Sequence, residues 1–278
     1  MSVTAGLSRP GHHGLHHIGS LPPAGRSAGV KCACSRLEWP RRLHALAGSL
    51  AMAFLVVHLG TCLFGFSPGK YTAAVDRLEA VKNLAPALVF AMIFLPFAYQ
   101  AGSGLYLLHH HGMKFNVNKC NRGGKTRFFL QRVTGILILL FLLLHVATLH
   151  AWGLHAVYRI TGSAALGRYA AGGIFAPGET AFRSTVAGIS QAWSASASGG
   201  GMNLTFSIFS LVGVLAVAFH AGNGIWSGGW VWKLAGTPER RKLLGCAATA
   251  VMTIFALAGG MAWYAFTWSN AARNLFAR

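Results

Sequence analysis

The sequence predicts an all-α membrane protein with five transmembrane helices. Three observations support this prediction. Over 278 residues the apolar content is 54% and the charged content only 10%, whereas a soluble domain of this length would carry a charged, water-facing shell. Basic residues gather between the apolar runs. Apolar segments long enough to cross a bilayer as helices fall near 43–66, 84–108, 128–152, 203–226 and 243–268.

Helices are favoured for these segments because a helix satisfies its own backbone hydrogen bonds in lipid. The net charge of +19 is compatible with a nucleic-acid binder, but such a protein would not devote most of its length to apolar runs. We therefore expect a lipid bilayer as partner and no nucleic acid. The expected domains are a disordered cytoplasmic tail over 1–38, a helical domain over 39–270 and a C-terminal tail over 271–278.

The distribution of Lys and Arg predicts the orientation. The N-terminal tail carries six, the connection over 109–127 five and the connection over 227–242 four. The connections over 67–83 and 153–202 carry three each, and the C-terminus carries two. Basic loops stay on the cytoplasmic side, so the N-terminus is expected in the cytoplasm and the C-terminus outside.

The boundaries of the segments follow the same logic. Arg41 and Arg42 precede the first segment, and Arg127, Gln131 and Arg132 open the third. The connection over 153–202 is the longest, rich in Ala, Gly and Ser, and a short surface helix is expected near 180–194. The connection over 67–83 is expected to be a loop outside the membrane.

Three of the apolar segments carry a histidine, and a fourth carries a glutamine at a matching depth. At a rise of about 1.5 Å per residue, His58 and His145 lie about 10–12 Å from the outer ends of their helices. Gln100 and His220 lie about 24 and 26 Å from the outer ends of theirs. The sequence therefore predicts an outer layer of His58 with His145 and an inner layer of Gln100 with His220.

Ionisable side chains inside membrane helices usually face a partner or cofactor. Two imidazoles facing each other across a bundle are the usual means of holding a haem b iron, so a haem-binding bundle is predicted. A zinc site would need four ligands, and only Cys62, one turn beyond His58, could add to the outer pair. Structural histidines or a proton path remain alternatives.

Four stretches then resemble one protein family. They are RRLHALAG at 41–48, LPFAYQ at 95–100, FLQRVTGILILLFLLLH at 129–145 and HAGNGIWS at 220–227. The family is the single-chain, five-helix cytochrome b membrane anchor (b558 type) of succinate dehydrogenases and fumarate reductases. The resemblance covers all five apolar segments and leaves the N-terminal tail and most of 153–202 unmatched.

The resemblance implies specific cofactor ligands. Members of this family carry two haems b; by resemblance His58 and His145 ligate the distal iron, and His220 is one ligand of the proximal iron. The family's fourth ligand follows a PF-x-Y motif, and that position here is Gln100. An amide binds haem iron weakly compared with imidazole. We therefore expect one haem b, or two with the proximal haem five-coordinate on His220.

Other polar residues near the inner surface are candidates for cofactor contacts. Gln131, Arg132 and Lys233 are predicted partners of haem propionates or quinone oxygens, since amides and cations favour such groups. Snorkelling of long side chains is the alternative for Lys233. His44 is a candidate for lining a quinone site, and a solvated interfacial histidine is the alternative there.

The resemblance implies the membrane-anchor, electron-transferring subunit of a succinate:quinone oxidoreductase in a bacterial inner membrane. Its expected partners are a flavoprotein subunit, an iron–sulfur subunit and a quinone, with menaquinone the expected species. Succinate chemistry would lie in other subunits, because this chain has no nucleotide-binding signature. Two alternatives remain: the cytochrome b anchor of another quinone-linked dehydrogenase, and a haem-free transporter that uses its histidines as proton relays.

Overall fold

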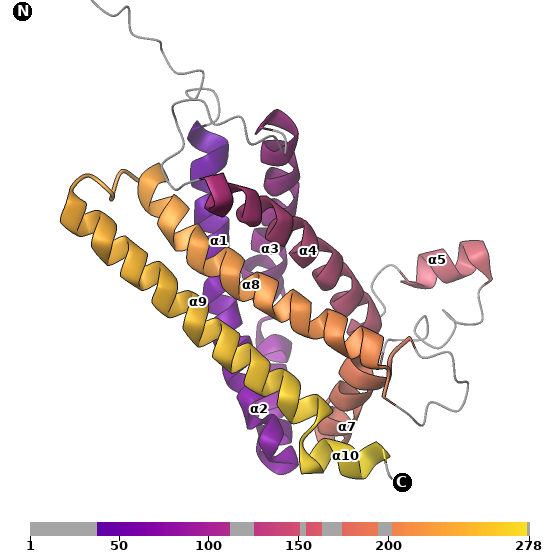
Figure 1. Cartoon of the computed structure of the whole chain (residues 1–278). Coiled ribbons are helices and arrows are strands. Elements are labelled where there is room, and N and C mark those ends of the chain that lie inside the picture. Colours follow the sequence, from indigo (N-terminus) through magenta and orange to yellow (C-terminus); the bar gives the residue numbers. More distant parts are fainter. Residues whose placement is uncertain (1–37, 112–124, 151–153, 163–173, 194–201, 277–278) are drawn as a thin grey trace, which may run out of the picture. The chain divides into compact units, whose positions relative to one another are not determined.

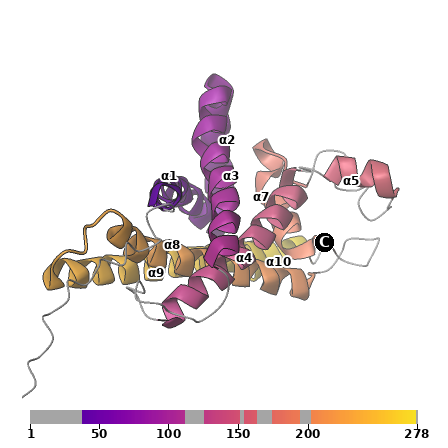
Figure 2. The same ribbon diagram turned by 90° about the horizontal axis from the view of Figure 1, so that it is seen from above.

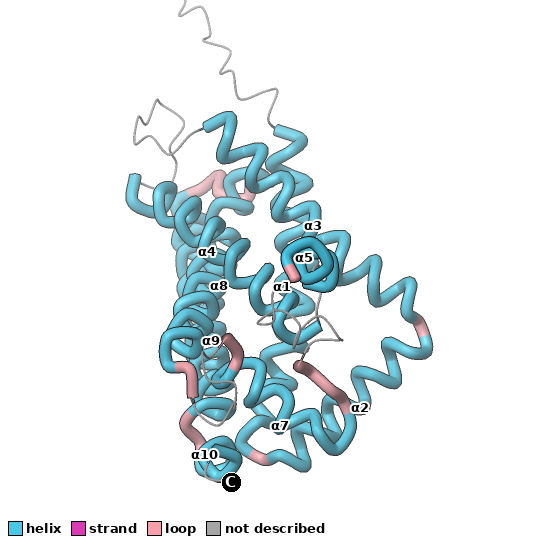
Figure 3. The backbone as a smooth tube through the Cα atoms, turned by 90° about the vertical axis from the view of Figure 1, so that its right-hand side faces the viewer, coloured by secondary structure: helices cyan, strands magenta, loops and turns pink. Residues whose placement is uncertain are grey.

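The fold is known from a computed structural model that describes residues 38–111, 125–150, 154–162, 174–193 and 202–276. The chain divides into two units, Met1–Arg36 and Leu37–Arg278. The first unit lies outside the described residues. So does the tail predicted over 1–38, except for Glu38, where the first helix begins. Within the described part of the second unit all regular structure is helical, with no strand (Figures 1 and 3).

Five of these helices are long and apolar enough to cross a membrane. They are α1 (Glu38–Leu63), α3 (Pro86–His111), α4 (Lys125–His150), α8 (Leu204–Val231) and α9 (Pro238–Thr267). The predicted all-α fold with five candidate membrane helices is thus confirmed, and the chain is a multi-pass membrane protein.

Local sequence signals explain where two of these helices begin. The side chain of Asn203 accepts a hydrogen bond of 3.1 Å from the backbone N–H of Phe206 and so caps α8. Thr237 accepts one of 3.3 Å from the N–H of Arg240, directly before Pro238 at the start of α9. Both are preferred capping residues. Proline is tolerated at the first helical position because an N–H there would have no partner within the helix.

The helices α8 and α9 run side by side along most of their length (Figure 1). Their close approach depends on glycine: a Cβ on Gly222 would stand 2.5 Å from the backbone oxygen of Ala248, and one on Gly259 would collide with Val214. Small residues allow helix backbones to approach in membranes. The helices α1, α3 and α4 lie grouped beside this pair (Figure 2), with α1 packed on α3 and α4 on α8.

Large apolar side chains cover the outside of the bundle. Such exposure would be costly in water and is expected of surfaces that face lipid tails. The side chains include Leu88, Leu95, Leu143, Ile254 and Leu257, each more than half exposed.

Short helices gather at one end of the bundle, which we call the capped end (Figures 1 and 3). They are η2 (Phe64–Phe66), α2 (Pro68–Leu84), η3 (Gly178–Thr180), α7 (Ala181–Val186), the π-helix η4 (Ala187–Gln191) and α10 (Asn270–Phe276). The remaining short helix is α5 (Leu154–Thr161).

The capped end corrects three expectations. The connection over 67–83 is the helix α2 and not a loop, because Pro68 starts a helix that packs on α7. The helix expected near 180–194 exists as α7 and η4, but it is largely buried and does not lie on the surface. Most of the segment over 271–278, expected to be a tail, belongs to α10, which packs on α9.

A hydrophobic core holds the capped end together. It consists of Tyr71, Val75, Ala181, Phe182, Val186, Phe266 and Ala272. The phenol of Tyr71 lies 2.9 Å from the hydroxyl of Thr185, so the buried polar group of α2 is paired with α7. Burying a side chain as large as Phe266 stabilises a fold by roughly 1.5–3 kcal/mol.

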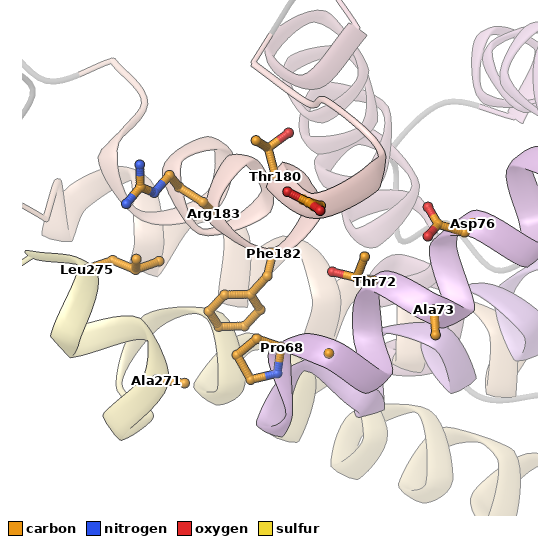
Figure 4. Close-up of a pocket in the computed structure, with 11 residues that line it drawn as sticks. Pro68, Thr72, Ala73, Asp76, Thr180, Phe182, Arg183, Ala271 and Leu275 are labelled. Carbon is orange, nitrogen blue, oxygen red and sulfur yellow. The ribbon is translucent and has the colours of Figure 1, made fainter.

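An open pocket of about 720 Å³ lies at the surface of this cap (Figure 4). Pro68, Thr72 and Asp76 of α2 line one side of it, and Phe182 and Arg183 of α7 line the other. None of the cofactor-binding residues predicted from the sequence is among its lining residues. The functional site must therefore be sought inside the bundle.

Candidate functional site

His58 of α1 and His145 of α4 face each other in the bundle. Their ring centroids are 6.3 Å apart and their planes are nearly perpendicular, at 86°. A metal–imidazole bond is about 2 Å long, so two imidazoles on one metal ion place their centroids about 6 Å apart. The predicted outer layer is thus a pair of rings at a separation that fits a shared metal.

The number of ligands limits which metal could bind. The sulfur of Cys62 lies 3.9 Å from Nε2 of His58, yet no three His, Cys, Asp or Glu side chains among the described residues converge as a metal site. A zinc site needs three or four protein ligands. Two protein ligands suffice for an iron whose other four positions are filled by a porphyrin.

Aromatic rings surround this pair. Phe54 stacks on His58 with 5.4 Å between centroids, and Phe141 lies at 5.3 Å from His145. Phe97 of α3 meets Phe54 edge-on at 5.7 Å. A Cβ on Gly213 would collide with Phe141, so the glycine allows α8 to pack closely against that ring. The two imidazoles therefore sit in apolar surroundings with few competing hydrogen-bond partners.

His220 of α8 is held by hydrogen bonds from α4. Its Nδ1 lies 3.2 Å from the hydroxyl of Thr134, and that hydroxyl donates to the carbonyl oxygen of Leu130 at 2.7 Å. The hydroxyl has one proton and gives it to Leu130, so it accepts from Nδ1–H of His220. With Nδ1–H as the donor, the lone pair of the imidazole lies on Nε2. A Cβ on Gly135 would stand 3.2 Å from Cε1 of His220, closer than an ordinary van der Waals contact, so the glycine gives this ring space.

Gln131 joins the same two helices. Its amide nitrogen donates to the carbonyl oxygen of His220 at 3.3 Å, and its amide oxygen accepts from Nδ2 of Asn223 at 2.7 Å. The role predicted for Gln131 at a propionate or quinone remains a prediction. In the structure the side chain fixes α8 to α4 one turn from the imidazole of His220.

Gln100 contacts His44 of α1. Its amide nitrogen lies 3.0 Å from Nε2 of His44, while its amide oxygen is buried with no hydrogen-bond partner among the described residues. Gly48 leaves space for this amide, since a Cβ there would stand 3.2 Å from the amide nitrogen. The structure thus brings Gln100 together with a histidine that the sequence placed at the membrane surface.

The remaining candidates lie towards the end of the bundle opposite the cap. The guanidinium of Arg132 lies over the ring of Phe128, 3.3 Å from its centroid. Lys233 follows the end of α8 with a positive φ of 59°. Three further arginines lie over tryptophan rings: Arg42 over Trp39 and Trp232, Arg127 over Trp226 and Arg241 over Trp230. We call this set of arginines and tryptophans the basic end.

Sequence reasoning missed three polar residues that hold the site together. Thr134 and Asn223 lie within the quoted motifs, and Ser103 follows Gln100 by three residues. A hydroxyl in a membrane helix commonly bonds the carbonyl four residues earlier. That signal predicts that the hydroxyl of Thr134 donates to the carbonyl oxygen of Leu130. It does not reveal that His220 lies beside the hydroxyl oxygen of Thr134.

No family model matches the chain, and no solved structure matches it. One curated protein is similar: the succinate dehydrogenase cytochrome b558 subunit of Bacillus subtilis (strain 168). The two are 27% identical over 228 residues, which are 81% of this chain and 95% of that protein. The chain is thus similar to a cytochrome b558 subunit of succinate dehydrogenase, in agreement with the resemblance of its motifs.

Proposed function

We propose that this chain is the membrane anchor of a succinate:quinone oxidoreductase and passes electrons between an iron–sulfur subunit and quinone. The observation that carries the proposal is the pair of His58 and His145, 6.3 Å apart in apolar surroundings. The similarity to a cytochrome b558 subunit supports the same function.

The residues of the outer pair fit a haem b. They supply two imidazoles from two helices, and the rings of Phe54 and Phe141 exclude water beside them. A haem bound there would accept and release single electrons, with its potential set by the ligands and the dryness of the site. The chain contributes the ligands, their orientation and the apolar packing.

The basic end supports docking of a partner protein. Arg42, Arg127 and Arg241 are kept in place by tryptophan rings, since a cation is attracted to the face of an aromatic ring. Positive charge on such a surface steers an acidic partner and favours its association. We assign this end to the iron–sulfur subunit, which in turn would carry the flavoprotein.

The same distribution of charge supports an orientation. Basic loops remain in the cytoplasm, so the basic end would face the cytoplasm and the capped end the outside of a bacterial inner membrane. A quinone, menaquinone by resemblance, would exchange electrons within the bilayer. Gln131, Arg132, Lys233 and His44 remain the candidate contacts for quinone oxygens or haem propionates.

The proposal is tested on the complex purified in detergent from its native membranes. A reduced-minus-oxidised absorption spectrum should show the Soret and α bands of a b-type cytochrome, and the preparation should contain an iron–sulfur protein and a flavoprotein. A lone, stable polypeptide without a haem spectrum would contradict the proposal and favour a transporter. A haem spectrum with a different flavoprotein would indicate the anchor of another quinone-linked dehydrogenase.

A further inference from the structure

The pocket at the capped end lies at the level where two membrane helices leave the bilayer. Pro68 follows shortly after Leu63, where α1 ends, and Ala271 follows shortly after Thr267, where α9 ends; Pro68 and Ala271 both line the pocket. Trp268, directly after α9, is 39% exposed. Tryptophan is enriched where membrane helices meet lipid headgroups. The pocket is therefore within reach of the headgroups of the surrounding lipids.

Side chains of both charges line this pocket. Asp76 of α2 and Glu179 of η3 supply carboxylates, and Arg183 of α7 supplies a guanidinium. All three residues are exposed, and their side chains make no ion pair or hydrogen bond with any other described residue. Their charges are thus available to a ligand.

The arrangement of these charges favours a ligand that carries both signs. Glu179 and Arg183 are four residues apart in consecutive helical turns, so their side chains project from the same side of the chain. Asp76 and Arg183 lie on opposite sides of the pocket, with Phe182 between them (Figure 4). A purely anionic ligand would be repelled by the two carboxylates, and a purely cationic one by the guanidinium. A zwitterion would be attracted by all three groups.

The rest of the pocket is largely apolar. Phe182, only 5% exposed, belongs to the hydrophobic core of the cap, and Pro68, Ala271 and Leu275 line the pocket near it (Figure 4). The volume of about 720 Å³ falls within the range of small-molecule pockets, about 300–1,000 Å³. Beside the charged groups there is thus apolar surface for the glycerol and the first carbons of an acyl chain.

We propose that this pocket binds the headgroup of a phosphatidylethanolamine molecule. The phosphate lies at Arg183, since a guanidinium forms charge-assisted hydrogen bonds with phosphate oxygens. The primary ammonium lies at Glu179 and Asp76, whose carboxylates accept its N–H groups. Residues of α2, η3, α7 and α10 meet at this pocket, so the bound lipid joins the parts of the cap. The inference goes beyond the proposed function and depends on neither haem nor partner subunits.

The test uses the complex purified in detergent from native membranes and washed free of lipid. Native mass spectrometry follows its titration with short-chain phosphatidylethanolamine, phosphatidylcholine and phosphatidylglycerol. Phosphatidylethanolamine should bind about tenfold or more tightly than the other two, the effect of one hydrogen bond to a charged group. Phosphatidylcholine has no N–H to donate to the carboxylates, and phosphatidylglycerol has no cation. Free phosphoethanolamine should bind more weakly than the lipid, because it leaves the apolar surface exposed to water.

Variants of the charged groups locate the lipid. Arg183→Gln and Glu179→Gln should each weaken the binding of phosphatidylethanolamine by about tenfold or more. The matched control is Arg273→Gln, which removes an exposed arginine of α10 that bonds Asn270 of its own helix and does not line the pocket. It should bind the lipid as tightly as the unmodified complex. Equal unfolding temperatures without added lipid would show that the variants are folded.

Two results would overturn the inference. The first is equal affinity of the unmodified complex for phosphatidylethanolamine and either other lipid, as expected of lipids that surround a bundle without a specific site. This comparison needs no variant, so it decides the question even if a substitution prevents assembly. The second is unchanged affinity in both Arg183→Gln and Glu179→Gln, which would mean that the lipid binds elsewhere. Equally tight binding of free phosphoethanolamine would indicate a soluble ligand in place of a lipid.

Discussion

The amide nitrogen of Gln131 lies 3.3 Å from the carbonyl oxygen of His220, and its amide oxygen lies 2.7 Å from Nδ2 of Asn223. One side chain of α4 thus holds two positions of α8. The contact holds the backbone of α8 against α4 at His220. The packing of these two helices therefore determines where the imidazole of His220 lies.

Gln131→Leu should destabilise the protein while leaving the outer pair of His58 and His145 in place. Two hydrogen bonds are lost at about 1 kcal/mol each, and Asn223 keeps a donor without its partner. The measurement is the unfolding temperature of the purified complex. The control is Ser49→Ala, which removes an exposed hydroxyl bonded to Ala45 of its own helix and should leave the unfolding temperature unchanged. Equal unfolding temperatures for Gln131→Leu and the unmodified complex would contradict this role.

The outer pair should behave as a single unit. His58→Ala and His145→Ala should each abolish the same low-spin bis-histidine signal, because the loss of either axial ligand leaves the iron five-coordinate. Electron paramagnetic resonance of the two purified variants provides the comparison, with His110→Ala as the control. A full low-spin signal retained in either variant would show that the pairing is wrong.

The contact between α8 and α9 gives a prediction about packing. Gly222→Ala should destabilise the bundle by about 1–3 kcal/mol, because the added methyl group would overlap the backbone oxygen of Ala248 and neither helix can move easily. Gly224→Ala is the matched control, since a Cβ at that position meets nothing within 4 Å. Thermal unfolding of the two variants side by side should show a loss for Gly222→Ala and no loss for Gly224→Ala. Similar losses of stability in the two variants would show that α8 and α9 do not approach each other most closely at Gly222.

The capped end should weaken in alkali. Burial raises the pKa of the Tyr71 phenol above its usual value, the charge of Cys62 adds to this, and the hydrogen bond with Thr185 opposes it. The phenol ionises near pH 10 in an unfolded chain. Above that pH the folded state binds more protons than the unfolded state, so stability falls as the pH rises.

The corresponding measurement is the unfolding temperature between pH 8 and pH 11, about the ordinary phenol pKa. The unmodified protein should lose stability more steeply across this range than Tyr71→Phe. That variant should also be less stable at neutral pH by about 1 kcal/mol, because the hydrogen bond to Thr185 is lost. Identical slopes for the two proteins would mean that another group governs the alkaline transition.

The sequence predicted the membrane helices because length and apolar content are sufficient to identify a spanning segment. It also predicted that His58 and His145 share a depth, since the rise of a helix converts position in sequence into distance. It could not predict α2, whose composition is too polar for a span and whose helix is stabilised by contacts of Tyr71 and Val75 with α7.

The inner site was harder to predict for a similar reason. Depth along a helix says nothing of rotation about its axis, so Gln100 and His220 could be assigned to one layer without knowing which neighbour each faces. The partner of Gln100 is His44, which lies one turn from Gly48 on a helix the sequence could not orient. The hydroxyls of Ser103 and Thr134 had no separate signal, because serine and threonine are common in membrane helices.

The order of the helices along the chain has a consequence for biogenesis. His58 lies on α1 and its partner His145 on α4. A chain synthesised from its N-terminus therefore cannot complete this pair of histidines during insertion of its first hairpin, α1 with α3. The pair is complete only once α4 is inserted. On the proposed function, a haem would therefore be captured only after three of the five long helices are in the membrane.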